Sequence, residues 1–199
     1  MKKFCLILVS LIFFLSISNA TNYSSDPEKF ISELVEDAIS KLSNKKISDE
    51  EKSDYIEKVA LENVDINALG LYTIGEIRKS AKKTDLEKYQ IVFEKYFLKS
   101  LTSRLKEYSS NKFEIISADV KSSNYTIIKS KILGSENQPE IKIDWRVYTK
   151  DPAKPLIRDL IVEGLSLART QKEEFSSILN SNDNDISILI SKLEEFVNS

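Results

Sequence analysis

Four consecutive segments with strand character, joined only by short polar turns, constrain the fold of this chain more than any other feature. They cover residues 112–122, 124–133, 140–149 and 156–165, and Ser, Asn, Gly, Asp and Pro are common in the gaps between them. These gaps are too short to hold the crossover connection that parallel strands require. The segments therefore predict an antiparallel meander of four strands.

The third segment has the clearest period-two pattern in the chain. Its apolar residues Ile141, Ile143, Trp145 and Val147 alternate with Lys142, Asp144, Arg146 and Tyr148. Successive side chains of a strand point to opposite faces of its sheet. We therefore expect one face of the sheet to be buried and the other to be largely wet.

Apolar residues at three- and four-residue spacing predict helices on both sides of the strands. We expect helices at residues 26–42, 48–63, 65–75 and 84–108 before the strands, and around residues 175–179 and 186–197 after them. Asp26, Ser48, Asp65 and Thr84 are the expected N-caps, and Glu51 completes a capping box with Ser48. This order predicts an α+β fold, with helices packed on a curved four-stranded antiparallel sheet.

The helix predicted at residues 84–108 has a broad aromatic stripe, which needs an apolar surface opposite it. We expect that surface to be the buried face of the sheet, so that the two enclose an apolar cavity. The helical wall would be Tyr89, Phe93, Tyr96, Phe97 and Leu101, and the sheet wall Ile141, Ile143, Trp145, Val147 and Val162. Stripes of this kind usually pack a core without binding anything, so both interpretations stay open from the pattern alone.

The first residues have the order of a secretory signal peptide. Lys2 and Lys3 precede an apolar run at residues 4–15, and the segment closes on Ser18-Asn19-Ala20. Thr21 follows the expected cleavage point, where a lipid-anchored protein would need a cysteine, and Cys5 lies inside the segment to be removed. We expect residues 1–20 to be cleaved and residues 21–199 to form one soluble domain in the periplasm.

Composition excludes several classes of function. The chain has no histidine, which removes the commonest general base and the commonest metal ligand. Its four glycines form no phosphate-binding loop, and 31 acidic residues against 29 basic ones argue against a nucleic-acid partner. We therefore expect no catalytic residues, no metal and no cofactor, and hence no enzyme.

Two segments carry a resemblance to a known family. The first is Ile143-Asp144-Trp145-Arg146-Val147, and the second runs from Ile157-Arg158-Asp159 through Glu163-Gly164 to Ser166-Leu167. Phe175-Ser176-Ser177-Ile178-Leu179, Val64-Asp65-Ile66, Ile74-Gly75, Tyr89 and Phe93 continue the match at the expected spacing. The chain resembles the MlaC (toluene-tolerance auxiliary) family of periplasmic phospholipid-binding proteins. Val64 and Leu101 depart from it, because aromatic residues are usual there.

The resemblance implies a fold like the nuclear-transport-factor cone, with acyl chains held between a curved sheet and the helices. It also implies the function: a monomeric carrier that shuttles phospholipid between the outer and inner membranes and maintains membrane asymmetry. The implied partners are an outer-membrane lipoprotein and an inner-membrane lipid transporter complex of the ABC type. The bound phospholipid would be cargo and not a cofactor.

Two alternatives from other classes remain open. A small-molecule enzyme of cone-shaped fold would need a polar group buried deep in the cavity, for which Tyr72, Tyr125 and Asp144 are the candidates. A periplasmic chaperone would have an exposed apolar patch in place of a cavity. Asp159 and Glu163 could suggest a pair of acid-base carboxylates, but ion pairing with Arg146 and Arg158 across the strands is the stronger expectation.

Overall fold

The computed structural model describes residues 23–105, 112–134 and 139–199. The predicted signal peptide at residues 1–20 lies outside these ranges. Within the described residues, helices come first, strands next and helices last, so the predicted α+β class is confirmed. None of the helices in this part of the chain is long and apolar enough to cross a bilayer.

Three of the predicted N-caps close the first helices. α1 (Pro27–Leu42) begins after Asp26, whose side chain accepts a hydrogen bond from the Lys29 amide. α2 (Asp49–Asn63) has both hydrogen bonds of the predicted Ser48 capping box, and α3 (Ile66–Thr73) begins after Asp65. Each cap satisfies backbone amides that the first turn of a helix leaves without a partner.

The later helices differ in detail from the prediction. A short helix, α4 (Ile77–Ser80), precedes α5 (Lys83–Leu105), so Thr84 lies inside the first turn of α5 and is not its cap. The predicted end of that helix, at residues 106–108, lies outside the described residues. The chain ends with α6 (Leu167–Asn180) and α7 (Ile186–Asn198), which begin after Ser166 and Asp185.

The sheet has five antiparallel strands in sequential order, and not four. They are β1 (Phe113–Ser122), β2 (Tyr125–Ile132), β3 (Ile141–Tyr148), β4 (Leu156–Val162) and β5 (Leu165–Ser166). The segment predicted as one strand at residues 156–165 reverses at Glu163 and Gly164, whose φ angles are 49° and 81°. A two-residue turn with positive φ at both positions matches the twist of a hairpin, so the chain folds back.

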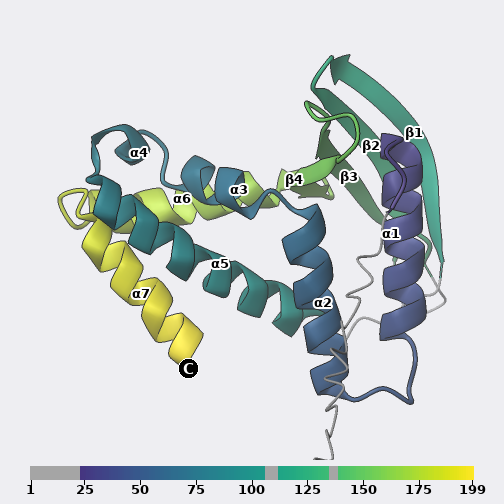
Figure 1. The fold of residues 1–199 in the computed structure, drawn as a ribbon, viewed down its shortest axis with the longest axis horizontal. Coiled ribbons are helices and arrows are strands. Elements are labelled where there is room, and N and C mark those ends of the chain that lie inside the picture. Colours follow the sequence, from purple (N-terminus) through teal and green to yellow (C-terminus); the bar gives the residue numbers. More distant parts are fainter. Residues whose placement is uncertain (1–22, 106–111, 135–138) are drawn as a thin grey trace, which may run out of the picture.

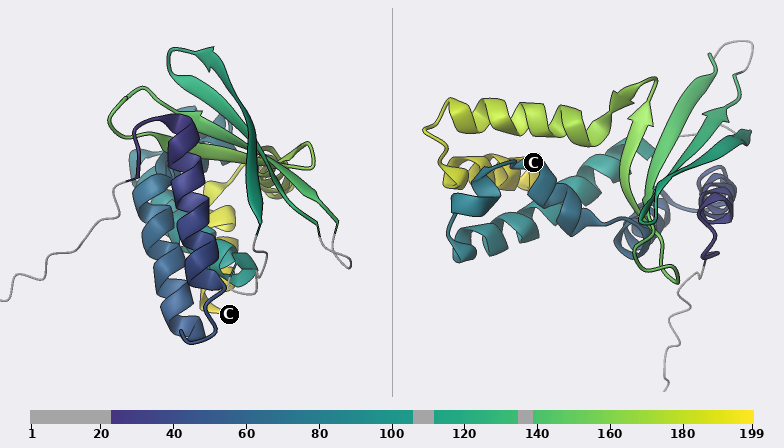
Figure 2. Two further views of the ribbon diagram at one scale, coloured as in Figure 1. Left: turned by 90° about the vertical axis from the view of Figure 1, so that its right-hand side faces the viewer. Right: turned by 90° about the horizontal axis from the view of Figure 1, so that it is seen from above.

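Two hydrophobic clusters organise the molecule. Figures 1 and 2 show the two groups of elements that contribute most of them, α1 with the strands on one side and α5, α6 and α7 on the other. The helical cluster is built from α3, α5, α6 and α7 around Tyr89, Phe93, Phe175 and Leu189, with Ala60 from α2 and Ile74. The sheet cluster joins Phe30, Ile31 and Leu34 of α1 to Ile128, Trp145, Val147 and Ile157 of the strands. Val64 packs against both clusters, and a bridge between Val64 and Ile157 ties the α2–α3 connection to β4.

The predicted pairing of the aromatic helix with the sheet is wrong. Helix α1 covers the sheet, whereas α5 packs on α7, α3 and α2. Figure 1 shows this separation, with α1 against the strands at one side and α5, α6 and α7 extending away at the other. At Gly70 of α3, a Cβ atom would lie 2.8 Å from the Phe93 ring, so the glycine allows α3 and α5 to approach closely.

Candidate functional site

The face of the sheet that carries Trp145 is the candidate ligand-binding surface, and we call it the inner face. Trp145 is paired with Ile128 on β2 and Leu160 on β4, and Ile143 is paired with Ser130 and Val162. Because directly paired residues share a face, these side chains lie together. All five residues of the predicted sheet wall, Ile141, Ile143, Trp145, Val147 and Val162, are therefore on the inner face.

Burial changes along the inner face. Val147 is 0% exposed and Trp145 is 8% exposed, because both lie in the sheet cluster with Phe30 and Ile31 of α1. Further along β3 and β4, Ile143 and Val162 are only half-buried. Covering this half-exposed apolar surface with an apolar ligand would remove it from water, which is favourable.

The inner face of β2, β3 and β4 carries no charged residue, and the polar groups of Trp145 and Ser130 on it are hydrogen-bonded within the protein. Trp145 Nε1 donates to Ser130 Oγ at 2.8 Å, and Ser130 Oγ donates to the Ile143 carbonyl oxygen, also at 2.8 Å. Because of these two hydrogen bonds, the indole N–H and the hydroxyl are buried with hydrogen-bond partners. This face suits apolar contact and has no group placed for acid-base chemistry.

A pocket of about 410 Å³ opens where α1 meets the ends of β1 and β2. Ile39, Phe113 and Leu133 are its apolar lining, and Glu36, Ser40, Lys112 and Glu114 complete it. Phe113 is paired with Ile132 and lies on the inner face, where its ring is 6.4 Å from that of Trp145 in an edge-on arrangement. The pocket is therefore an opening from the surface toward the sheet cluster.

The predicted helical wall lies elsewhere, in the helical cluster. Tyr89 and Phe93 are buried, and their rings are 5.7 Å apart. Tyr89 Oη lies 2.8 Å from Thr73 Oγ1 and 3.2 Å from the Gly70 carbonyl oxygen, and burial raises the pKa of this phenol well above its ordinary value. Tyr96, Phe97 and Leu101 are half-buried against the same cluster. The structure thus does not bring the two predicted walls together.

The two carboxylates weighed as an acid-base pair make structural contacts, and exposed Glu163, in the turn after β4, accepts a hydrogen bond from the Lys142 amide. Asp159 is buried and accepts from Arg146 Nη1 at 3.4 Å, from Ser166 Oγ at 2.6 Å and from the Ala168 amide at 3.0 Å. The expected ion pair with Arg146 is therefore confirmed. Arg158 pairs instead with Asp65, at 2.7 Å, since consecutive residues of a strand do not face each other and the Asp159 carboxylate is already held by other groups.

The residues named for an enzymatic alternative are not deeply buried. Tyr72 is 40% exposed, and Tyr125 and Asp144 are half-buried on the face opposite to Trp145. Within the described residues, no group of three or more acidic, histidine or cysteine side chains is placed to hold a metal ion. The buried polar group that this alternative needs is therefore not found at Tyr72, Tyr125 or Asp144.

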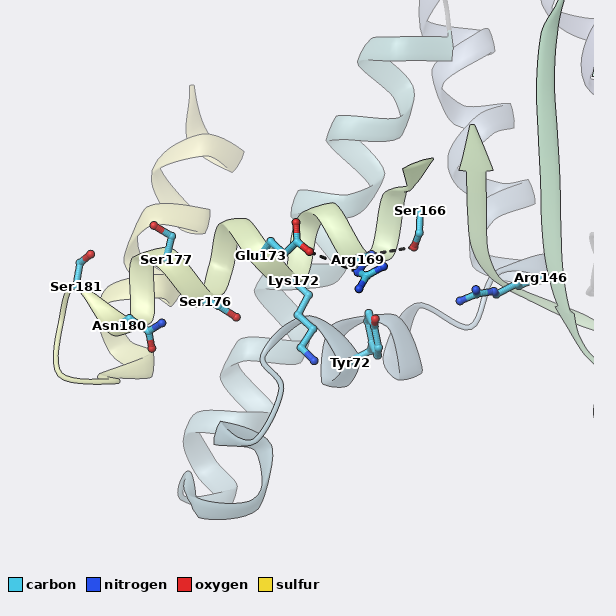
Figure 3. A pocket seen from close by; sticks show the side chains of 10 residues that line it. All are labelled: Tyr72, Arg146, Ser166, Arg169, Lys172, Glu173, Ser176, Ser177, Asn180 and Ser181. Atoms are coloured by element: carbon cyan, nitrogen blue, oxygen red, sulfur yellow. Dashed lines mark hydrogen bonds and ion pairs between the residues drawn. The ribbon is translucent and has the colours of Figure 1, made fainter. Parts of the chain in front are cut away.

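A second and larger pocket, of about 760 Å³, lies between α3, α6 and the outer face of β3 (Figure 3). Its lining is polar: Tyr72, Arg146, Ser166, Arg169, Lys172, Glu173, Ser176, Ser177, Asn180 and Ser181. The residues come from distant parts of the sequence, so sequence reasoning missed the pocket. The only available signal was the polar stripe at three- and four-residue spacing from Arg169 to Asn180.

Comparison with known proteins adds an independent line of observation. The model of the family described as "MlaC protein" matches residues 32–195. The solved structure of the phospholipid-binding protein from Ralstonia solanacearum, in complex with a phospholipid, is similar to this chain. The two share 15% sequence identity and a TM-score of 0.71, over 86% of this chain and 96% of the other. No curated protein matches the chain.

Proposed function

Because the chain belongs to the MlaC family, we propose that it is a periplasmic phospholipid carrier that holds acyl chains against the inner face of its sheet. The observation that carries the proposal is the uncharged inner face, buried under α1 at Trp145 and Val147 but half-open at Ile143 and Val162. The phospholipid bound in the Ralstonia solanacearum structure of similar fold supports the same ligand class.

The energetics of carrying a lipid explain why such a face is needed. Each methylene removed from water contributes roughly 0.8 kcal/mol, so two acyl chains dissolve in water only when a protein covers them. The polar headgroup is already hydrated and needs no buried partner. The half-open part of the inner face, together with the pocket lined by Ile39 of α1, Phe113 and Leu133, would provide this cover.

A carrier also needs a donor and an acceptor of lipid. In this proposal the chain crosses the periplasm between an outer-membrane lipoprotein and an inner-membrane transporter complex, and its shuttling maintains membrane asymmetry. The family match supports this placement, and so does the secretory pattern of residues 1–20. The inner face has a binding role only, so the proposed activity needs no catalytic residue.

The test is native mass spectrometry of residues 21–199 purified from a bacterial host, followed by lipid extraction. The expected result is one bound diacyl phospholipid, with its occupancy reduced at least about tenfold in Ile143→Gln. The matched control is Ile127→Gln, because Ile127 is also half-buried but lies on the opposite face of the sheet. Circular dichroism verifies that both variants are folded.

Other outcomes would contradict the proposal. A folded protein that stays empty after incubation with phospholipid vesicles would exclude a lipid carrier. Binding of a hydrophobic dye without co-purified lipid would favour the chaperone alternative. Equal lipid loss in Ile143→Gln and Ile127→Gln would remove the inner face as the site.

A further inference from the structure

The larger, polar pocket has a charge opposite to that of the molecule as a whole. The chain has a formal net charge of −2, yet Arg146, Arg169 and Lys172 line this pocket with Glu173 as the single carboxylate. Figure 3 shows the three cationic side chains and Tyr72 directed into the space between α3, α6 and the sheet. A concave surface with clustered cations concentrates positive potential and attracts anions.

An ion pair with Asp159 holds Arg146 in place and leaves other N–H donors of its guanidinium available. Its Nη1 is 3.4 Å from Asp159, a carboxylate whose remaining contacts are to Ser166 and the Ala168 amide. The Arg146 side chain is 43% exposed, whereas that of Asp159 is 4% exposed. A guanidinium has five N–H donors in a planar fork, so Arg146 can bind an incoming anion while Asp159 holds its position.

The other two cations are also available. Arg169 pairs with Glu173 at 3.5 Å, but both side chains are more than 70% exposed, and a surface pair of this kind holds its partners only weakly. Lys172 Nζ lies 5.1 Å from the centre of the Tyr72 ring, and no described carboxylate lies within ion-pair distance of it. An anion with several oxygens can therefore displace Glu173 and recruit Lys172.

The neutral groups of the pocket narrow the ligand class. Ser166, Ser176, Ser177, Asn180 and Ser181 contribute hydroxyl and amide groups along α6 and at its ends. A carboxylate has two oxygens and is satisfied by one arginine, whereas a phosphate ester has three acceptor oxygens for charged and hydroxyl donors together. From this combination we infer that the pocket is a second binding site, which takes a ligand bearing a phosphate ester.

This site is separate from the inner face. Arg146 follows Trp145 on β3, so the two side chains point to opposite faces of the sheet. The acyl chains of the proposed cargo and the phosphate ester would therefore occupy different sides of the molecule. The same chemistry is offered by a phospholipid headgroup in a membrane surface and by a soluble phosphate ester.

Two probes applied to the mature protein, residues 21–199, test the site and distinguish these sources. The soluble probe is glycerol 3-phosphate, titrated at low salt while backbone amide resonances are followed by NMR. The membrane probe is a vesicle flotation assay that compares phosphatidylglycerol with phosphatidylcholine. The test variant is Arg169→Gln with Lys172→Gln, and the matched control is Lys45→Gln with Lys46→Gln, which removes two exposed cations outside the pocket.

Saturable resonance shifts along α6, with a Kd that rises at least about tenfold in the test variant and not in the control, would support the site and a soluble ligand. Flotation with phosphatidylglycerol alone, lost in the test variant and kept in the control, would support the site with a membrane headgroup as its source. The site is overturned if neither probe binds, or if the two double variants lose binding equally, since that result reflects net charge only. The amount of bound lipid measured by mass spectrometry should be equal in both variants. Failure of the polar site would therefore leave the carrier proposal intact.

Discussion

The helical cluster and the inner face are both apolar, but they differ in how completely the protein itself fills them. In the helical cluster, Phe93 contacts the rings of Tyr89, Phe97 and Phe175 at centroid distances of 5.7–6.3 Å, and four helices close around it. On the inner face, close packing at Val147 gives way to half-buried Ile143. The first region is closely packed throughout, whereas the second leaves part of its apolar surface exposed to solvent.

This difference shows why aromatic content is a poor guide to a ligand site. The aromatic side chains of α5 have found their partners in α3, α6 and α7, so a ligand would have to displace packing that already exists. The aliphatic end of the inner face is only half-buried at Ile143 and Val162, so a ligand there would displace less packing. A ligand gains most where the protein has left apolar surface open.

Phe93→Ala has the largest expected effect, and it tests whether Phe93 packs the helical cluster or contacts the ligand. The substitution removes a buried ring from the helical cluster, and we expect the free energy of unfolding to fall by about 3–5 kcal/mol in urea denaturation. The lipid content of the protein that remains folded should not change. A variant that keeps its stability but loses lipid would instead restore Phe93 to the wall of the cavity.

Two valines allow the buried end of the inner face to be compared with its half-buried end. In lipid-free protein, Val147→Ala should cost about 2 kcal/mol of unfolding free energy, because Val147 is fully buried, and Val162→Ala about 1 kcal/mol or less, because Val162 is half-buried. Lipid occupancy should fall more in Val162→Ala. The opposite order of lipid loss would move the ligand under α1.

The smallest expected effect is the contribution of Tyr89 to the pH dependence of the unfolding free energy at alkaline pH. Burial raises the pKa of Tyr89 in the folded state, so its stabilising contribution is complete below the unfolded pKa of about 10 and is lost as the pH rises above it. At pH 11 we expect a loss on the order of 1 kcal/mol relative to pH 8. Urea denaturation of Tyr89→Phe should show a pH dependence weaker by this amount. An unchanged pH dependence would mean that Tyr89 ionises as freely in the folded protein as in the unfolded one.

Local features of the fold could be predicted because local interactions determine them. The alternation in β3 and the caps at Asp26, Ser48 and Asp65 each depend on a few neighbouring residues, and the structure confirms them. The reversal at Glu163 was not predicted, because a glutamate at positive φ is uncommon and apolar residues stand on both sides of the turn, at Val162 and Leu165.

The packing partner of α5 could not be predicted, because a stripe on a helix shows which side is buried and not what covers it. The sheet and α7 are both apolar enough to cover α5, and α7 occupies that position. The same limit applies to the polar pocket, since nothing local in the sequence places Arg146 of β3 and Lys172 of α6 in one pocket. The sheet wall was predicted as one surface because a single strand and its register define most of it.

The contact between α5 and α7 also has a consequence for the order in which the chain can fold. These two helices make the most extensive helix–helix contact among the described elements, yet about 100 residues separate Tyr96 from Phe196, whose rings lie 5.0 Å apart across it. During synthesis from the N-terminus, the β-hairpins can form as soon as they emerge, because their contacts are local. The aromatic side of α5 must wait for the last helix. A chain arrested before α7 would therefore expose the side of α5 around Tyr96 that packs against Phe196, and would offer it to chaperones and proteases.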